Sequence, residues 1–159
     1  MKLSLAKSLT VILTLLALIL SSIGVTPAYA AWIFTNRTTA NGLGSNGVNG
    51  VFANGSTVYA ATLNGLSIST NGGNSFTNKT TANGLGHNYV FGVFASGSKV
   101  YAATPGGLSI STNGGNSFIN KTTANGLGNN YVSGVFASGR TIDRVKGGGL
   151  SNATNGANS

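Results

Sequence analysis

Few residues in this sequence could carry out acid–base or nucleophilic chemistry. The chain of 159 residues contains one acidic side chain, Asp143, one histidine, His87, and no glutamate or cysteine. Glycoside hydrolysis ordinarily needs two carboxyl groups, which a single chain cannot supply here. A Ser-His-Asp triad would have to join His87 to Asp143 without a nucleophile elbow, and a zinc site lacks its ligands. These residue types predict a protein that is not an enzyme and that uses no metal or other cofactor.

His87 lies in a link rich in glycine and asparagine, and the equivalent residue one repeat later is Asn129. A position that exchanges His for Asn is typical of a solvated loop rather than of a general base. Tyr89 and Tyr131 follow these two positions and have two interpretations. They could stack on sugars or aromatic partners, or they could pack at the start of a strand. His87, Tyr89 and Tyr131 are therefore candidate binding residues, and a glycan or an envelope protein is the kind of partner considered.

The elements that would position these residues come from a repeat of 42 residues. The motif Asn-Gly-Leu-Gly starts at positions 41, 83 and 125, and Gly-Val-Phe-Ala starts at positions 50, 92 and 134. The segment 66–76 returns unchanged as 108–118, and a degraded third copy covers 150–159. A period of about 40 to 50 residues rich in β-branched and aromatic residues favours propeller blades over a helical solenoid. We therefore expect an all-β chain.

One repeat predicts four short antiparallel strands, over 90–95, 99–104, 108–112 and 117–123. The Asn-Gly pair at 113–114 predicts a primed hairpin turn between the last two. The phase of the repeats predicts strand four of a first blade at 31–40, blades at about 48–81 and 90–123, and a degenerate partial blade at 132–159. Four strands and one longer link per repeat are typical of a β-propeller blade.

About three repeats are fewer than the four to eight blades of most propellers. Three arrangements stay open at this point. The chain could be a truncated piece of a longer propeller, it could assemble with other copies into a ring, or it could form an open stack with exposed sheet edges.

The repeated segments 69–76 and 111–118 resemble the Asp-box, or bacterial neuraminidase repeat, with Asn where that family has Asp. The resemblance implies a β-propeller whose motif turns lie at the blade periphery, away from the catalytic face. An Asx side chain can accept backbone N–H groups across a tight turn, and glycine tolerates positive φ. We expect structural turns built from ten residues, namely Ser69, Asn71, Gly72, Gly73, Phe76, Ser111, Asn113, Gly114, Gly115 and Phe118.

A sialidase-like enzyme is expected to use three arginines, a Tyr nucleophile with a Glu partner, and an Asp acid/base. After position 30 the sequence contains only three arginines, Arg37, Arg140 and Arg144, and only one acidic residue. The sequence therefore departs from the sialidase pattern. The resulting interpretation is a non-catalytic repeat protein, acting as a binding or scaffold module or as a fragment of a larger propeller. The alternative is a fragment of a sialidase-like or other glycoside hydrolase that lacks its catalytic residues.

The first thirty residues are expected to be a signal peptide. Lys2 and Lys7 precede an apolar run over 9–20, and Ala28-Tyr29-Ala30 supplies a small-residue cleavage pattern, so cleavage is predicted after Ala30. The run is shorter than the roughly 20 residues that span a bilayer. We therefore expect a secreted protein, periplasmic or extracellular, with no membrane span after cleavage and no disulfides.

The chain is strongly basic, with a formal net charge of +8, of which Lys2 and Lys7 supply two. The remaining basic residues are scattered, one or two per repeat, whereas nucleic-acid binders usually carry a dense basic stripe. Nucleic acid is therefore not an expected partner, and self-association is a further option. The scattered residues are Arg37, Lys79, Lys99, Lys121, Arg140, Arg144 and Lys146.

Overall fold

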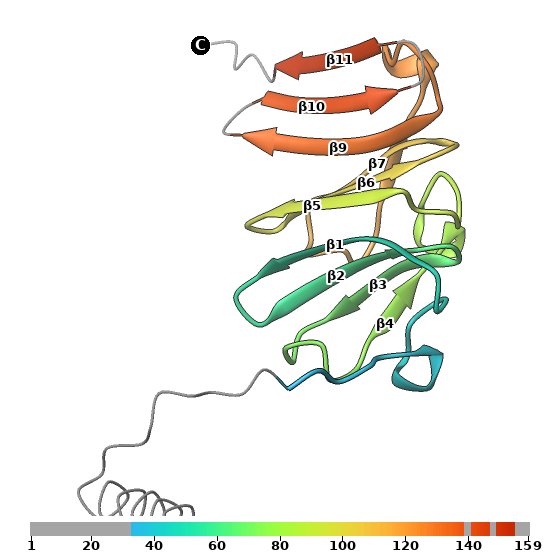
Figure 1. Cartoon of the computed structure of the whole chain (residues 1–159). Coiled ribbons are helices and arrows are strands. Elements are labelled where there is room, and N and C mark those ends of the chain that lie inside the picture. The colour runs from blue at the N-terminus through green and yellow to red at the C-terminus, as the bar shows by residue number, and fades with distance from the viewer. Residues whose placement is uncertain (1–32, 139–140, 147–148, 155–159) are drawn as a thin grey trace, which may run out of the picture. The chain divides into compact units, whose positions relative to one another are not determined.

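A computed structural model describes residues 33–138, 141–146 and 149–154 (Figure 1). The chain divides into two units, Met1–Thr35 and Asn36–Ser159. In the first unit, the described residues 33–35 form neither strand nor helix. The predicted signal peptide, its cleavage after Ala30, and most of the third copy of the repeated turn lie outside the described residues. Within the described part, no helix is long and apolar enough to cross a membrane.

The second unit consists of three antiparallel sheets made from consecutive strands. The first sheet contains β1 (Val48–Asn54), β2 (Thr57–Thr62), β3 (Gly65–Ser69) and β4 (Thr77–Lys79), in that order. The second contains β5 (Gly92–Ser96), β6 (Lys99–Thr104), β7 (Gly107–Ser111) and β8 (Ile119–Lys121). The third contains β9 (Val132–Ser138), β10 (Thr141–Lys146) and β11 (Gly149–Thr154), with β10 in the middle. The expected all-β chain with four-stranded antiparallel sheets is confirmed for the first two sheets.

The period-two alternation of the strands places successive side chains on opposite faces of each sheet. In β6, Val100 and Ala102 enter the core between the first two sheets, whereas Tyr101 and Ala103 enter the core on the other face. The small alanines allow the sheets to approach closely, and Leu66 and Leu108 are fully buried. A middle sheet therefore needs a neighbour on both of its faces.

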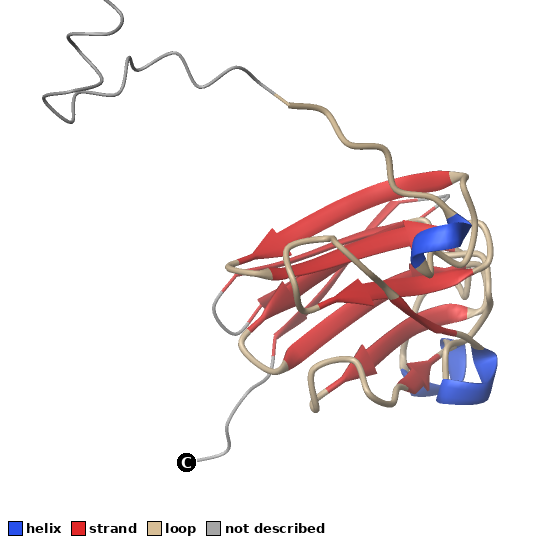
Figure 2. Ribbon diagram, turned by 90° about the horizontal axis from the view of Figure 1, so that it is seen from below, coloured by secondary structure: helices blue, strands red, loops and turns tan. Residues whose placement is uncertain are grey.

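A short 3-10 helix precedes each sheet, at one end of the strands (Figure 2). These helices are η1 (Thr39–Asn41), η2 (Thr81–Asn83) and η3 (Thr123–Asn125). Each begins at a threonine with an extended backbone and ends at a glycine with positive φ, +92° at Gly84. A Cβ atom on Gly84 would lie 2.0 Å from the carbonyl oxygen of Phe118. Only glycine fits this close approach between the link and the second sheet.

The fourth strand of the first two sheets is shorter than predicted, because its flanking residues have other bonding partners. Phe118 donates its N–H to the carbonyl of Asn83 in the preceding link, at 2.8 Å, so the strand begins only at Ile119. Thr122 serves as the N-cap of the next 3-10 helix, which ends the strand at Lys121. Phe76 bonds Asn41 in the same way, also at 2.8 Å.

The expected first strand over 31–40 is wrong for its described part. Residues 33–38 form no regular structure, and residues 39–41 belong to η1. In the first two sheets the fourth strand pairs along the third strand. Residues 33–38 have no such strand beside them within the described part of the chain.

Candidate functional site

The repeated turns of segments 69–76 and 111–118 are held by their own side chains. Asn71 Oδ1 accepts the Ser75 N–H at 3.0 Å and the Ser69 hydroxyl at 2.8 Å, while its Nδ2 donates to Ser75 Oγ at 2.9 Å. Ser69 Oγ in turn accepts the N–H of Gly73 at 2.9 Å. The second copy, from Ser111 to Ser117, repeats these bonds. The amide group therefore satisfies the turn without a carboxylate.

The predicted primed turn forms at residues 113–116, where the Asn116 N–H donates to the Asn113 carbonyl at 3.4 Å, but its two central residues are glycines rather than the Asn-Gly pair. No non-glycine residue among those described has a positive φ, so Asn71 and Asn113 precede the central pair of each turn instead of belonging to it. The positive φ values fall on the glycines, +72° at Gly114 and +89° at Gly115. The asparagine side chain must point back into the turn to accept N–H groups, which favours an ordinary backbone at that position.

The second repeated turn also contacts the first sheet. A Cβ atom on Gly115 would lie 2.4 Å from Cδ1 of Ile68 in β3, so this glycine packs against its neighbour. Phe118 is buried in the core between the two sheets. Phe76, the equivalent residue in the first sheet, is only half-buried. The turn motif therefore sets packing between sheets in addition to its own shape.

His87 is the acceptor of a short turn in the link between the first two sheets. Its Nδ1 accepts the N–H of Tyr89 at 2.8 Å. Asn129 Oδ1 accepts the N–H of Tyr131 at the same distance, and Ser45 Oγ accepts that of Gly47 at 3.0 Å. Three different side chains therefore make one equivalent bond. This role explains why His and Asn exchange at the position.

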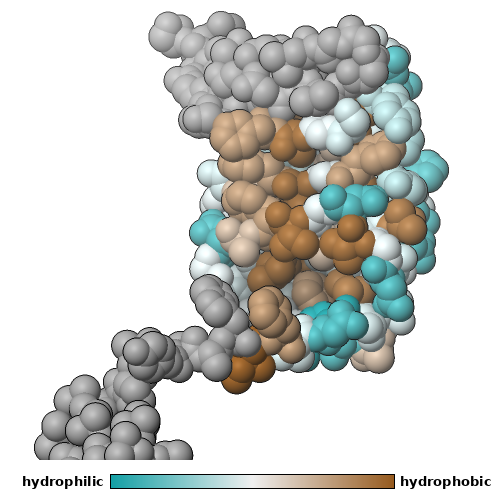
Figure 3. Space-filling view, viewed as in Figure 1, coloured by the Kyte–Doolittle hydropathy of each residue, from teal (hydrophilic) through white to brown (hydrophobic). Residues whose placement is uncertain are grey.

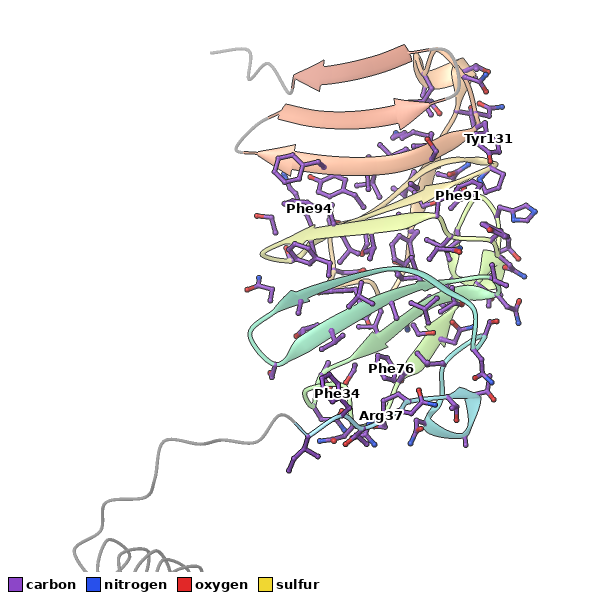
Figure 4. All side chains as sticks on the ribbon, in the orientation of Figure 1. Phe34, Arg37, Phe76, Phe91, Phe94 and Tyr131 are labelled. Atoms are coloured by element: carbon purple, nitrogen blue, oxygen red, sulfur yellow. The ribbon has the colours of Figure 1, made fainter. Side chains whose placement is uncertain are left out.

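The two candidate tyrosines lie in an aromatic cluster at the link end of the strands. Phe91 lies between them, with ring centroids 4.7 Å from Tyr89 and 5.0 Å from Tyr131. Figure 4 shows Phe91 and Tyr131 close together at this end, with Phe94 nearer the opposite end. Tyr131 keeps 45% of its surface exposed, whereas Tyr89 and Phe91 are half-buried. We call Tyr89, Phe91 and Tyr131 the link aromatic cluster.

A groove of about 290 Å³ separates the outer strands of the first sheet from the repeated turn of the second. Its wall combines the apolar side chain of Ile68 with polar and backbone groups of the two sheets, and the lining residues are Ile68, Thr70, Ser75, Thr77, Lys79, Gly114 and Asn116. Hydroxyl groups and one ammonium group suit a polar or anionic small molecule. We call this cavity the inter-sheet groove.

Two buried tyrosines and the single aspartate lie in strands of the three sheets. Burial raises the pKa of the Tyr59 and Tyr101 phenols above their ordinary value of 10.0, so both stay neutral at physiological pH. The backbone of Asp143 lies in the middle strand of the third sheet, opposite Phe136 and Asn152. Among the described residues there is no group of three or more His, Cys, Asp or Glu side chains that could hold a metal ion.

The sequence names Tyr89, Tyr131 and His87 as candidates but misses Phe91 and the polar lining of the inter-sheet groove. It places Phe91 in a strand interior, although its position two residues after Tyr89 would put both on one face of an extended segment. Lys79 and the threonines of the inter-sheet groove could not be found, because the groove forms only when two sheets pack together.

The comparisons with known proteins are sparse. No protein-family model matches the chain, and no curated protein matches it. Among solved structures, the chain is similar to an ancestral GH74 enzyme, with a TM-score of 0.54 and 28% sequence identity. The match covers 64% of this chain and 14% of the enzyme chain. The chain thus spans only a small part of a structurally similar glycoside hydrolase.

Proposed function

We propose that this protein is a non-catalytic β-propeller repeat protein of the Asp-box type, secreted from the cell, which acts as a binding or scaffold module. One observation carries the proposal: the polar side chains of the repeat hold turns. Asn71 accepts bonds from its own turn, and His87 accepts the N–H of Tyr89. An asparagine amide cannot act as a general acid or base, and the Nδ1 atom of His87 is already used by its own turn.

The link aromatic cluster is the binding surface that we propose. Aromatic rings provide large apolar faces with low conformational freedom, which suits them to binding surfaces. Tyr131 combines an exposed ring with a packed neighbour, Phe91, which fixes its position. A carbohydrate is the favoured ligand class, because sugar rings present apolar faces edged with hydroxyl groups.

The experiment is a screen of the purified wild-type protein on an array of neutral and acidic oligosaccharides, followed by calorimetry with the best ligand. Tyr131→Ala should weaken binding about tenfold, which corresponds to about 1.4 kcal/mol. Ile119→Ala is the matched control, since Ile119 is also an exposed apolar side chain but lies in β8. No binding by the wild type, or equal binding by Tyr131→Ala, would contradict the proposed surface. Loss of binding in Lys79→Ala alone would assign the ligand to the inter-sheet groove.

A second candidate function is a fragment of a glycoside hydrolase, favoured by the similarity to the GH74 enzyme. Release of reducing sugar from polysaccharides would distinguish the two. Asp143 is the only side-chain carboxyl group in the sequence. Activity that Asp143→Asn abolishes would support the hydrolase and overturn the non-catalytic proposal.

A further inference from the structure

Among the described residues, the first and third sheets leave opposite faces uncovered. The sheet stack uses the same repeat positions at each internal contact, so equivalent residues can be compared directly. Val90 and Val132 are buried against the preceding sheet, with 0% and 1% of their surfaces exposed, whereas Val48 in the first sheet is 41% exposed. Val51 is 64% exposed, while its equivalents Val93 and Val135 pack against the two cores. The first sheet thus presents a contact face without a partner among the described residues.

We call this surface of Val48, Val51 and Phe76 the leading face. Phe76 is half-buried, whereas Phe118 at the same repeat position is buried between sheets. Figure 4 shows Phe76 and Arg37 on the side of the first sheet that faces away from β5. The leading face carries the residues that the second sheet uses to pack on the first.

The third sheet shows the complementary surface, which we call the trailing face. Phe52 and Phe94 lie 4.9 Å apart between ring centroids, and Phe94 and Phe136 lie 5.0 Å apart. Phe52 and Phe94 are half-buried beside the following sheet, but Phe136, last in the series, is 57% exposed. Figure 3 shows apolar side chains in a band along the stacked strands β1, β5 and β9. The band continues to the edge of the described side chains.

We propose that the leading face of one copy of this chain docks on the trailing face of a second copy. The contact would repeat the internal contacts between sheets, with Phe136 against Phe52 of the next copy and near its Val51. The chain already contains two contacts of this kind, between its first and second sheets and between its second and third sheets. A second copy therefore presents the side chains that each uncovered face packs against.

The number of sheets fixes the size of the assembly. Head-to-tail contacts form a ring when the rotation closes and a filament when it does not. Closed β-propellers usually contain four to eight sheets. Counting the three described sheets of each copy, two copies make six, whereas one copy falls below this range and three copies exceed it. The proposed assembly is therefore a closed ring of two copies.

The edge of the third sheet gives independent support. Within the described residues, β11 has no fourth strand beside it, unlike β3 and β7. Residues Thr35-Asn36-Arg37 repeat the Thr77-Asn78-Lys79 sequence of β4, with Arg for Lys. Since Leu66 pairs with Lys79 and Ile68 with Thr77, the equivalent register would pair 150–152 with 35–37 of the next copy. Docking of the two faces would bring this segment to the edge that it fits.

The test measures the mass of the full chain, expressed with export so that the host processes it, by light scattering and sedimentation. Wild type should have twice the mass of one processed chain. Val51→Glu alone and Phe136→Lys alone should each give single chains, because both place an unpaired charge in the contact. Both positions are exposed within one chain, so the variants should keep the wild-type circular dichroism spectrum. Ile119→Lys, on a side chain 68% exposed in β8, should leave the double mass unchanged.

Mixing the Val51→Glu and Phe136→Lys variants should restore the double mass. In a mixed pair, one contact joins the introduced carboxylate to the introduced ammonium group, and the other contact is wild type. A single-chain wild type would overturn the proposal, as would single variants that keep the double mass. A contact between two leading faces would be broken by Val51→Glu only and would likewise overturn it. A mass that keeps growing with concentration would indicate open stacking and would refute the ring.

Discussion

The contact between the second repeated turn and the first sheet permits a matched test of how the sheets pack. Gly114 and Gly115 are neighbours with similar positive φ values, +72° and +89°. A Cβ atom on Gly114 meets no atom within 4 Å, whereas one on Gly115 would lie 2.4 Å from Ile68 Cδ1. Replacing each glycine by alanine therefore separates the backbone cost from the cost of crowding Ile68.

Both substitutions should carry the cost of a left-handed conformation, about 1–2 kcal/mol. Gly115→Ala should add an overpacking cost of about 1–3 kcal/mol, because Ile68 or the turn must shift. The expected loss in the free energy of unfolding is thus about 1–2 kcal/mol for Gly114→Ala and about 2–5 kcal/mol for Gly115→Ala. The excess measures the contact between sheets.

Ile68→Val removes the Cδ1 methyl group and should relieve the crowding. Alone it should cost about 0.5–1.5 kcal/mol, the usual range for this change in a core. Combined with Gly115→Ala, it should recover a coupling energy of about 1–2 kcal/mol, within the range for residues in contact. Urea unfolding followed by circular dichroism gives all the required values. The reasoning is refuted if Gly115→Ala costs no more than Gly114→Ala, or if Ile68→Val shows no coupling.

Three further predictions concern hydrogen bonds and ionisation. His87→Asn should leave the midpoint of thermal unfolding unchanged because Asn can accept the same N–H, whereas His87→Ala should lose about 0.5–1.5 kcal/mol in urea unfolding. Asn71→Asp should be tolerated at pH 7, because the carboxylate keeps both acceptor bonds in a basic chain, and Asn71→Ala should cost about 1–3 kcal/mol by the same assay. The free energy of unfolding should fall as pH rises above 10, because the unfolded chain loses phenolic protons that folded Tyr59 and Tyr101 retain. Replacing both tyrosines by Phe should make the unfolding midpoint less dependent on pH in this range.

Much of the fold could be predicted from local pattern. The strand predicted over 99–104 matches β6, because alternating Val100, Ala102 and Tyr101, Ala103 residues fit a strand buried on both faces. The fourth strand could not be delimited in this way. The sequence Phe-Ile-Asn-Lys-Thr-Thr reads as extended throughout, and only the long-range bond from Phe118 to Asn83 shows where the turn ends.

The candidate site was likewise predictable where it depends on local sequence and not where it depends on packing between sheets. The exposed Tyr131 was identifiable from its place beside a polar link. The packing of Phe91 between two tyrosines from different links depends on how the sheets stack, which no local pattern specifies. The inter-sheet groove also joins Lys79 to the distant Gly114 and Asn116. Sites made between repeats are therefore harder to predict than the repeats themselves.

The bond from each fourth strand back to the link before its sheet has a consequence for synthesis on the ribosome. Asn41 is joined to Phe76 and Asn83 to Phe118, so each of the first two sheets is closed by a segment only 35 residues downstream. Chains emerge from the N-terminus at about 5–20 residues per second, and contacts of short sequence separation form early. The first sheet can close its own ends within seconds of its last strand emerging, before the whole second sheet has emerged. The sheets of a growing chain would then form one after another, and only the sheet that is still incomplete could pair its strands wrongly.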